Sequence, residues 1–146
     1  NSMKKNKSKT DFRDVRENFK KRVPNCIFCK NKVKGKHLEN ELAYATFDSY
    51  PVTKFHALII PKRHVVDYFG LHQAEINSCN ELIKEMRNTI LKKDKKILGF
   101  NIGMNAGKIA GQTIMHCHIH LIPRRKGDVN NPQGGVRSVI PSKQHY

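Results

Sequence analysis

Three histidines alternate with apolar residues in the last third of the chain. His116, His118 and His120 are separated by Cys117 and Ile119. Successive side chains of a β-strand point to opposite faces, so this spacing predicts three imidazoles on one face, about 6.7 Å apart along the strand. Such a row of imidazoles can contact one extended ligand or bind one metal ion. A neutral imidazole is also a good nucleophile near pH 7.

A loop with two glycines leads into the histidine segment. It runs from Asn105 through Gly107 and Gly111 to Gln112 and Thr113. Glycine lets the backbone approach a ligand closely, and amide and hydroxyl donors suit phosphate oxygens. We therefore expect this loop to contact an anion held over the histidines.

Two cysteines near the N-terminus have metal-ligand spacing. Cys26-x-x-Cys29 supplies half of a tetrahedral zinc site, but no second cysteine pair follows, so the other ligands would have to be histidines elsewhere. Two reduced thiols in a loop are the alternative. Cys79 and Cys117 fall on apolar faces, and we assign both to the core.

The composition limits the class of protein. A chain of 146 residues with 38% apolar residues fits one domain, and its 28 Lys and Arg against 12 Asp and Glu give a net charge of +16. This charge attracts polyanions, nucleotides and nucleic acids alike. No apolar run approaches the ~20 residues of a membrane span, and no hydrophobic stretch follows the charged residues 1–9. We expect no membrane segment, no secretory signal and a cytoplasmic setting.

The chain divides into three parts. We expect residues 1–24 to form a basic, flexible arm because they mix charge with few large apolar groups. Residues 25–128 form the predicted globular domain. Residues 129–146 form a tail whose Val136, Val139 and Ile140 predict packing on the domain or on a partner subunit.

The hydrophobic pattern predicts an α+β fold. Apolar residues at steps of three and four predict one long helix over 71–91: Ile76, Cys79, Ile83, Met86 and Ile90. Apolar runs predict strands at 42–47, 55–60, 98–104 and 114–122, with Pro123 ending the last one. We expect an antiparallel sheet of about five strands with one long helix and a short one.

These motifs resemble the histidine triad family of nucleotide hydrolases and transferases, whose signature is His-φ-His-φ-His-φ-φ. The matching segments are His116-Cys-His118-Ile-His120-Leu-Ile122, the preceding Gly111-Gln112-Thr113, and His56-Ala-Leu-Ile-Ile-Pro61-Lys-Arg-His64 with Asp48 before it. The resemblance covers about Cys26 to Asp128.

The resemblance implies a covalent mechanism. His118 would attack a nucleotide phosphorus to form a nucleotidyl-histidine, which water would hydrolyse to a nucleoside monophosphate, while His120 would help the leaving group depart. The other implied roles are ribose binding by Asp48, support of the histidines by His56, phosphate binding by Asn105, Gln112 and Thr113, and a purine pocket at Ile27 and Phe28. The implied substrates are dinucleoside polyphosphates or nucleotide conjugates.

The resemblance also implies a metal and a dimer. Bacterial members, and the related galactose-1-phosphate uridylyltransferases, complete a Cys-x-x-Cys site with two histidines, which here are His64 and His116. A Cys₂His₂ set leaves no open position, so the zinc would be structural. Members usually form homodimers by extending the sheet. Pro123-Arg124-Arg125 is closer to members that cleave dinucleoside polyphosphates than to the phosphoramidase branch.

Two other functions remain open at this point. One is a metal-dependent phosphohydrolase in which a His-x-His zinc site activates water. The other is a basic nucleic-acid-binding module, although no recognition-helix motif and no basic strand with interleaved aromatics supports it.

Overall fold

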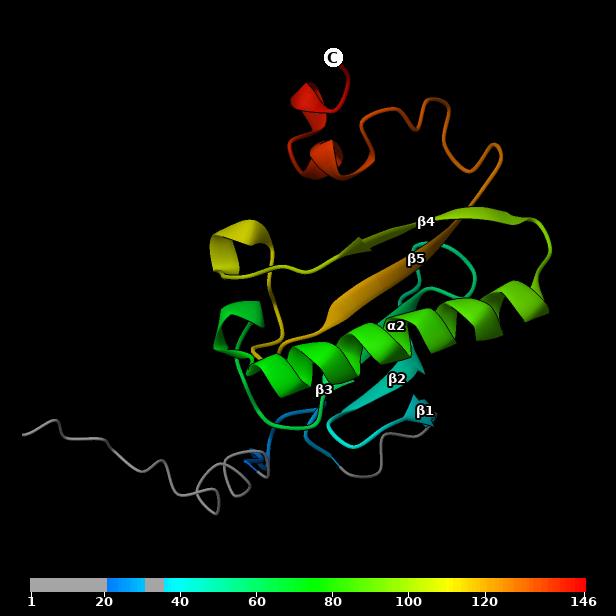
Figure 1. Cartoon of the computed structure of the whole chain (residues 1–146). Helices are drawn as coiled ribbons and strands as arrows, with labels where there is room; N and C mark the ends of the chain where they lie inside the picture. Colours follow the sequence, from blue (N-terminus) through cyan, green and yellow to red (C-terminus); the bar gives the residue numbers. More distant parts are fainter. Residues whose placement is uncertain (1–20, 31–35) are drawn as a thin grey trace, which may run out of the picture.

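The protein folds as one antiparallel sheet with a long helix across it (Figure 1). The computed structural model describes residues 21–30 and 36–146. The strand order is β1-β2-β3-β5-β4. The elements are β1 (Lys36–Glu39), β2 (Ala43–Phe47), β3 (Ala57–Pro61), α2 (Gln73–Lys93), β4 (Ile97–Gly103) and β5 (Ile119–Arg125). This architecture confirms the predicted α+β class, and the shorter helices are 3-10 turns.

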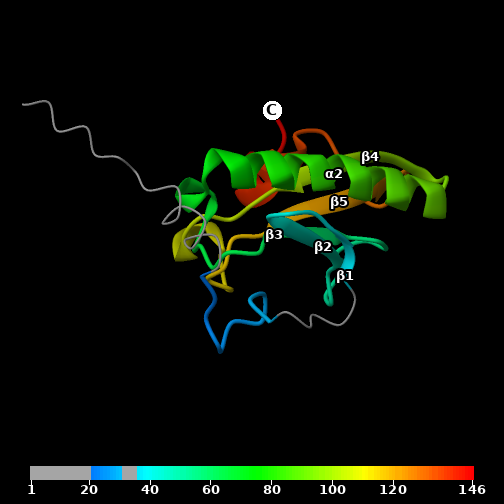
Figure 2. The same ribbon diagram turned by 60° about the horizontal axis from the view of Figure 1, so that its bottom comes forward.

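Alternating side chains give the sheet two apolar faces. Small residues of the central strands, such as Ala45 and Ala57, face α2 and let Leu82 and Met86 pack closely on the sheet. On the opposite face, Tyr44, Leu58 and Ile60 pack with Phe28. Figure 2 shows α2 and the segment 21–30, drawn in blue, on opposite sides of the sheet. The sheet therefore carries its helix on one face and the Cys26-x-x-Cys29 segment on the other.

The last strand begins later than predicted. β5 starts at Ile119, so His116 and His118 precede it, and the prediction that all three histidines share one strand face is wrong for these two. The residues before Ile119 leave the ladder because the Cys117 N–H bonds to the Val65 carbonyl, 2.7 Å away in a loop.

The same strand continues through Pro123 to Arg125, so the prediction that Pro123 ends it is wrong. Beyond Leu121, β5 pairs only with β4, so one side of the strand needs no ladder hydrogen bond and a residue without an N–H is tolerated. The short edge strand β1 was not predicted. It pairs only with β2.

The two ends of the chain differ in what the structure describes. Residues 1–20 of the predicted arm lie outside the described residues. The tail forms two 3-10 turns, at Gly135–Val139 and Pro141–Lys143, and the first of them contacts β4. None of the helices in the described part of the chain is long and apolar enough to cross a membrane.

Candidate active site and metal centre

A chain of hydrogen bonds connects two of the histidines at the ends of the central strands. His56 Nε2 lies 2.9 Å from His120 Nδ1. The Val52 N–H, which can only donate, lies 3.1 Å from His56 Nδ1. His56 Nδ1 must therefore accept, and its proton sits on Nε2, which donates to His120 Nδ1. His120 in turn keeps its own proton on Nε2.

His118 has the opposite tautomer. Its Nδ1 lies 2.7 Å from the carbonyl oxygen of His116, which can only accept, so Nδ1 carries the proton and Nε2 has a free lone pair. The half-buried ring lies between Phe28 and His120, with ring centroids 5.1 Å and 5.2 Å away. The histidine with the unprotonated outer nitrogen is thus next to the one that presents an N–H.

Burial keeps the rings of His120 and His56 neutral. Desolvation, together with repulsion from His118 and His56, lowers the pKa of His120 to about 4, although Asp48 acts in the opposite sense. Burial also lowers the pKa of His56. Neutral imidazoles are the forms that can act as nucleophiles and as hydrogen-bond relays.

The residue before His56 has an unusual backbone conformation. Phe55 has φ of 72°, in the left-handed region, which costs a non-glycine residue of the order of 1 kcal/mol. Its ring packs on Phe47 at 5.7 Å between centroids, and the Lys54 ammonium lies 5.2 Å from its centre. These contacts offset the strain and hold the turn that delivers His56 to the site.

A cavity of about 560 Å³ opens beside the histidines. His56, His120 and Asn105 line it from the sheet side, and Val136 and Val139 line it from the tail. His118 is not part of this lining and lies next to it, against His120. The cavity is large enough for a small organic ligand.

The other residues predicted to bind substrate lie in different surroundings. Asp48 accepts the Tyr50 N–H through Oδ1 at 2.8 Å, and its Oδ2 is 3.5 Å from His56 Nε2. Thr113 is exposed. Ile27 is also exposed, whereas Phe28 is buried against the sheet.

Gln112 has no side-chain atom free for a phosphate. It is buried, its amide nitrogen donates to the carbonyls of Val66 and Ile114, and its amide oxygen accepts the Gly107 N–H. The structure therefore corrects its predicted side-chain role, because the amide holds the glycine loop in place instead.

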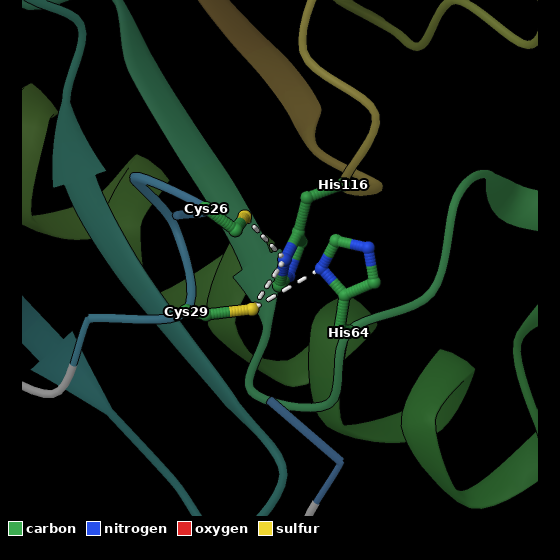
Figure 3. A group of neighbouring side chains, drawn as sticks. All are labelled: Cys26, Cys29, His64 and His116. Atoms are coloured by element: carbon green, nitrogen blue, oxygen red, sulfur yellow. Dashed lines mark hydrogen bonds between the residues drawn. The ribbon is translucent and has the colours of Figure 1, made fainter. Parts of the chain in front are cut away.

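Cys26, Cys29, His64 and His116 meet on the face opposite α2 (Figure 3). Cys26 Sγ lies 3.3 Å from His116 Nδ1, and Cys29 Sγ lies 3.2 Å from His64 Nδ1. Zinc bonds of about 2.3 Å to sulfur and 2.0 Å to nitrogen place tetrahedral ligands about 3.5 Å apart. The cluster can therefore hold a metal ion with little movement.

The tautomer of His116 suits a metal ligand. Its Nε2 lies 2.7 Å from the carbonyl of Pro61, so Nε2 carries the proton and Nδ1 presents a lone pair to the cysteines. Burial lowers the pKa of His116 to about 4, which keeps the ring neutral. Burial raises the pKa of the Cys29 thiol, an effect that a bound cation would reverse.

Asp48, His56 and His120 form a second group with metal-ligand atoms close together. His56 Nε2 carries a proton there, because Nδ1 accepts from Val52, so it has no lone pair for a cation. Moving that proton to Nδ1 would set two N–H groups against each other. The hydrogen bonds thus favour a proton relay over a metal site in this group.

Comparisons with known proteins show the family of this chain. The protein-family model of the HIT domain matches residues 30–127 of this chain. The chain belongs to the histidine triad family. A HIT family protein from Bacillus anthracis is 37% identical, with a TM-score of 0.67 over 73% of this chain and 77% of that one.

Two further relatives bear on the sites. A Zn-bound histidine triad protein from Mycobacterium smegmatis is 30% identical, with a TM-score of 0.66 over 73% of this chain and 80% of that one. The adenosine 5'-monophosphoramidase of Schizosaccharomyces pombe is 37% identical over 107 residues, which are 68% of this chain and 74% of that one.

The burial of His120 predicts its titration. We expect the ring to stay neutral from pH 8 to pH 5 and to titrate near pH 4, as measured by ring ¹⁵N chemical shifts. Between this value and the ordinary pKa of about 6.5, the unfolded chain binds the proton and the folded chain does not. The contribution of His120 to stability therefore falls as the pH drops from 6.5 towards 4. A midpoint near 6.5 in the folded protein would contradict this environment.

Proposed function

We propose that this protein is a nucleotidyl hydrolase that works through a covalent intermediate on His118. The observation that carries the proposal is the pair of opposite tautomers. The His116 carbonyl holds the proton of His118 on Nδ1, so Nε2 is the nucleophile, and the neighbouring His120 presents an Nε2–H. A nucleophile beside a proton donor is the arrangement that substitution at phosphorus needs.

The reaction has two displacements at one phosphorus. His118 Nε2 forms a bond to the phosphorus of a nucleoside 5'-phosphate group, and the bond to the leaving group breaks. The leaving group departs with a hydrogen bond from the His120 Nε2–H and takes its proton from solvent. Water then attacks the same phosphorus and gives up a proton to solvent, the N–P bond breaks, and His118 and a nucleoside monophosphate are released. Splitting one displacement into two lowers the barrier of each.

We assign the substrate contacts from the same geometry. Asn105 lines the cavity together with His120, and this position supports a role for Asn105 in phosphate binding. Exposed Thr113 can reach the phosphate from the loop that Gln112 holds. Asp48 keeps Oδ2 as an acceptor for ribose hydroxyls. The base would lie against Ile27, which is exposed, and Phe28, whose ring touches His118.

We propose adenosine 5'-phosphate derivatives as substrates, with either a nitrogen or a phosphate leaving group. The name of the fission-yeast relative supports a P–N bond. The segment Pro123-Arg124-Arg125, which follows the histidine motif, supports a dinucleoside polyphosphate. However, the guanidinium groups of Arg124 and Arg125 already have partners. Arg124 binds Asp128 and Asn101, and Arg125 binds Asp94, so extra phosphates would have to displace them.

The covalent step predicts a trapped adduct. Rapid mixing with adenosine 5'-monophosphoramidate or diadenosine tetraphosphate, followed by quenching under conditions that preserve N–P bonds and mass spectrometry, should show an adenylyl group on His118. His118→Ala should lower kcat by about 10³-fold or more, because it removes the nucleophile. His145→Ala, which removes an exposed histidine of the tail, is the matched control and should leave kcat unchanged.

An active His118→Ala variant, or an adduct on another residue, would refute the covalent proposal. Activity that chelators abolish while the protein stays folded would favour metal-activated water instead.

We further propose that zinc occupies the Cys26, Cys29, His64 and His116 cluster. It would fix the N-terminal segment against the sheet, with His116 two residues from the nucleophile. The Zn-bound mycobacterial relative supports the choice of metal. Reduced thiols suit the cytoplasm, where we place the protein.

Native mass spectrometry should show one zinc per chain. Cys29→Ala should lose the metal, whereas Cys79→Ala, which removes a buried core thiol on α2, should keep it. Chelation should lower the melting temperature, because a structural zinc contributes to folding. Wild-type protein that is folded, reduced and free of zinc in the presence of excess metal would rule the site out.

We propose that two chains pair along β4. This strand is at the edge of the sheet, and its Leu98 and Ile102 are 77% and 49% exposed. An exposed edge with large apolar side chains is a ready site for strand pairing. The tail, residues 129–146, contacts β4 through its first 3-10 turn and would add to this interface of the domain formed by residues 25–128.

The same native mass spectra should give the mass of a dimer at micromolar concentration. Ile102→Asp should shift it towards the monomer, since a carboxylate would be buried at the contact. A wild-type monomer at this concentration would contradict the pairing.

A further inference from the structure

We propose that the buried ion pair of Arg63 and Glu75 is a positioning device for the zinc cluster and for the triad. Neither residue touches the cluster or the cavity. The pair acts through the segment Pro61–Val65, which it fixes to the start of α2. This inference rests on the zinc site proposed above and concerns how the protein holds that site in shape.

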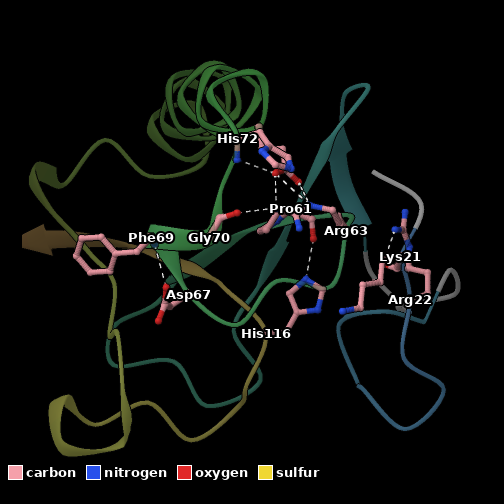
Figure 4. Close-up of polar contacts among 10 residues, drawn as sticks. Lys21, Arg22, Pro61, Arg63, Asp67, Phe69, Gly70, His72 and His116 are labelled. Atoms are coloured by element: carbon pink, nitrogen blue, oxygen red, sulfur yellow. Dashed lines mark hydrogen bonds and ion pairs between the residues drawn. The ribbon is translucent and has the colours of Figure 1, made fainter. Parts of the chain in front are cut away.

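The pair is buried and makes several hydrogen bonds. Figure 4 shows Arg63 beside Pro61, Gly70 and His72. The side chains of Arg63 and Glu75 are 12% and 1% exposed. Arg63 Nε lies 3.0 Å from Glu75 Oε2, and Arg63 Nη2 lies 2.7 Å from Oε1. Two parallel charge-assisted bonds restrict both the distance and the orientation of the two groups.

Backbone groups complete the network at both ends of the pair. The His72 N–H donates to Glu75 Oε1 at 2.9 Å, and Arg63 Nη2 donates to the Gly70 carbonyl at 2.7 Å. Glu75 also lies in the first turn of α2, where the helix dipole favours a negative charge. The carboxylate is thus held to the helix, and the guanidinium brings the chain after β3 to it.

The residues on either side of Arg63 hold the site. The Pro61 carbonyl accepts the His116 Nε2–H at 2.7 Å, and His64 Nδ1 points at Cys29 Sγ. The Val65 carbonyl accepts the Cys117 N–H at 2.7 Å, next to His118. One segment of five residues therefore sets the tautomer of His116, supplies the ligand His64 and anchors the chain before β5.

This segment has little regular structure to hold it. After Pro61 it leaves the sheet, and the chain enters α2 only at Gln73. The chain between this segment and α2 packs tightly on it, since a Cβ added at Gly70 would lie 2.5 Å from Val65 Cγ2. Loss of the Arg63–Glu75 contact would leave the charged partner buried and let the segment move.

Buried ion pairs are weak evidence for stability, because desolvation offsets much of their attraction. If the pair positions the zinc ligands, its loss should change the zinc affinity of the folded protein. Changes in residues that orient metal ligands typically lower metal affinity 10–100-fold. A merely structural pair would change the free energy of unfolding and leave the affinity of the folded protein for zinc unaltered.

The test compares two isosteric variants of carboxylates at opposite ends of α2. Glu75→Gln breaks the proposed device. Asp94→Asn breaks the contact of Asp94 with Arg125 Nε, 2.9 Å long, which joins the end of α2 to β5 far from the segment Pro61–Val65. Zinc affinity is measured on each folded protein by competition with a chromophoric chelator, and stability is measured by urea unfolding.

We expect Glu75→Gln to weaken zinc binding at least tenfold and Asp94→Asn to change it less than twofold. Equal zinc affinity in wild type and folded Glu75→Gln would overturn the proposal. If Glu75→Gln does not fold, Arg63→Lys replaces it. Lysine keeps the charge but loses the two-pronged contact, so weaker zinc binding is expected again, and unchanged binding overturns the proposal.

A second readout separates this inference from the zinc site itself. If wild type binds no zinc, the proposed zinc site fails, and the positioning role is then judged from the ring ¹⁵N shifts of His116. We expect a single Nε2–H tautomer in wild type and a mixture in Glu75→Gln. The same single tautomer in both proteins would overturn the positioning role.

Discussion

A histidine can act as a ligand or a nucleophile only through a ring nitrogen without a proton, and backbone groups decide which nitrogen that is here. The Pro61 carbonyl holds the proton of His116 on Nε2, so Nδ1 faces the cysteines. The His116 carbonyl holds the proton of His118 on Nδ1, so Nε2 stays free. The Val52 N–H fixes the tautomer of His56, and His56 in turn fixes the tautomer of His120. In the proposed mechanism, these tautomers divide metal binding, attack and hydrogen bonding to the leaving group among His116, His118 and His120.

The fold supplies these backbone groups at fixed positions. β3 and β5 are neighbours in the sheet, with Leu58 opposite His120, so the residues at their ends lie side by side. The chain leaves the ladder just before Ile119, which turns His116 towards the cysteines. One apolar face of the sheet is occupied by α2 and the other by the segment that carries Cys26 and Cys29. The metal cluster and the candidate active site can therefore share one motif and still have separate surroundings.

Much of this was predictable from sequence, and the failures have physical causes. The steps of three and four in the apolar residues predicted α2 to within two residues at each end. The alternation of histidines suggested one strand, but a period of two cannot reveal that the Cys117 N–H binds a loop carbonyl. Gln112 looked like a phosphate ligand because sequence does not show that its amide is already used. Arg63 and Glu75 were missed, although a glutamate one turn before Cys79 on the apolar stripe signals a buried charge that needs a partner.

The central claim is that the backbone presents His118 Nε2 as an unprotonated nitrogen before any substrate arrives. Long-range ¹H–¹⁵N correlation spectra of the free protein at pH 7 test it directly, because protonated and unprotonated ring nitrogens have well-separated ¹⁵N shifts. We expect His118 to show a protonated Nδ1 and an unprotonated Nε2. A proton on Nε2, or rapid exchange between the two tautomers, would contradict the account.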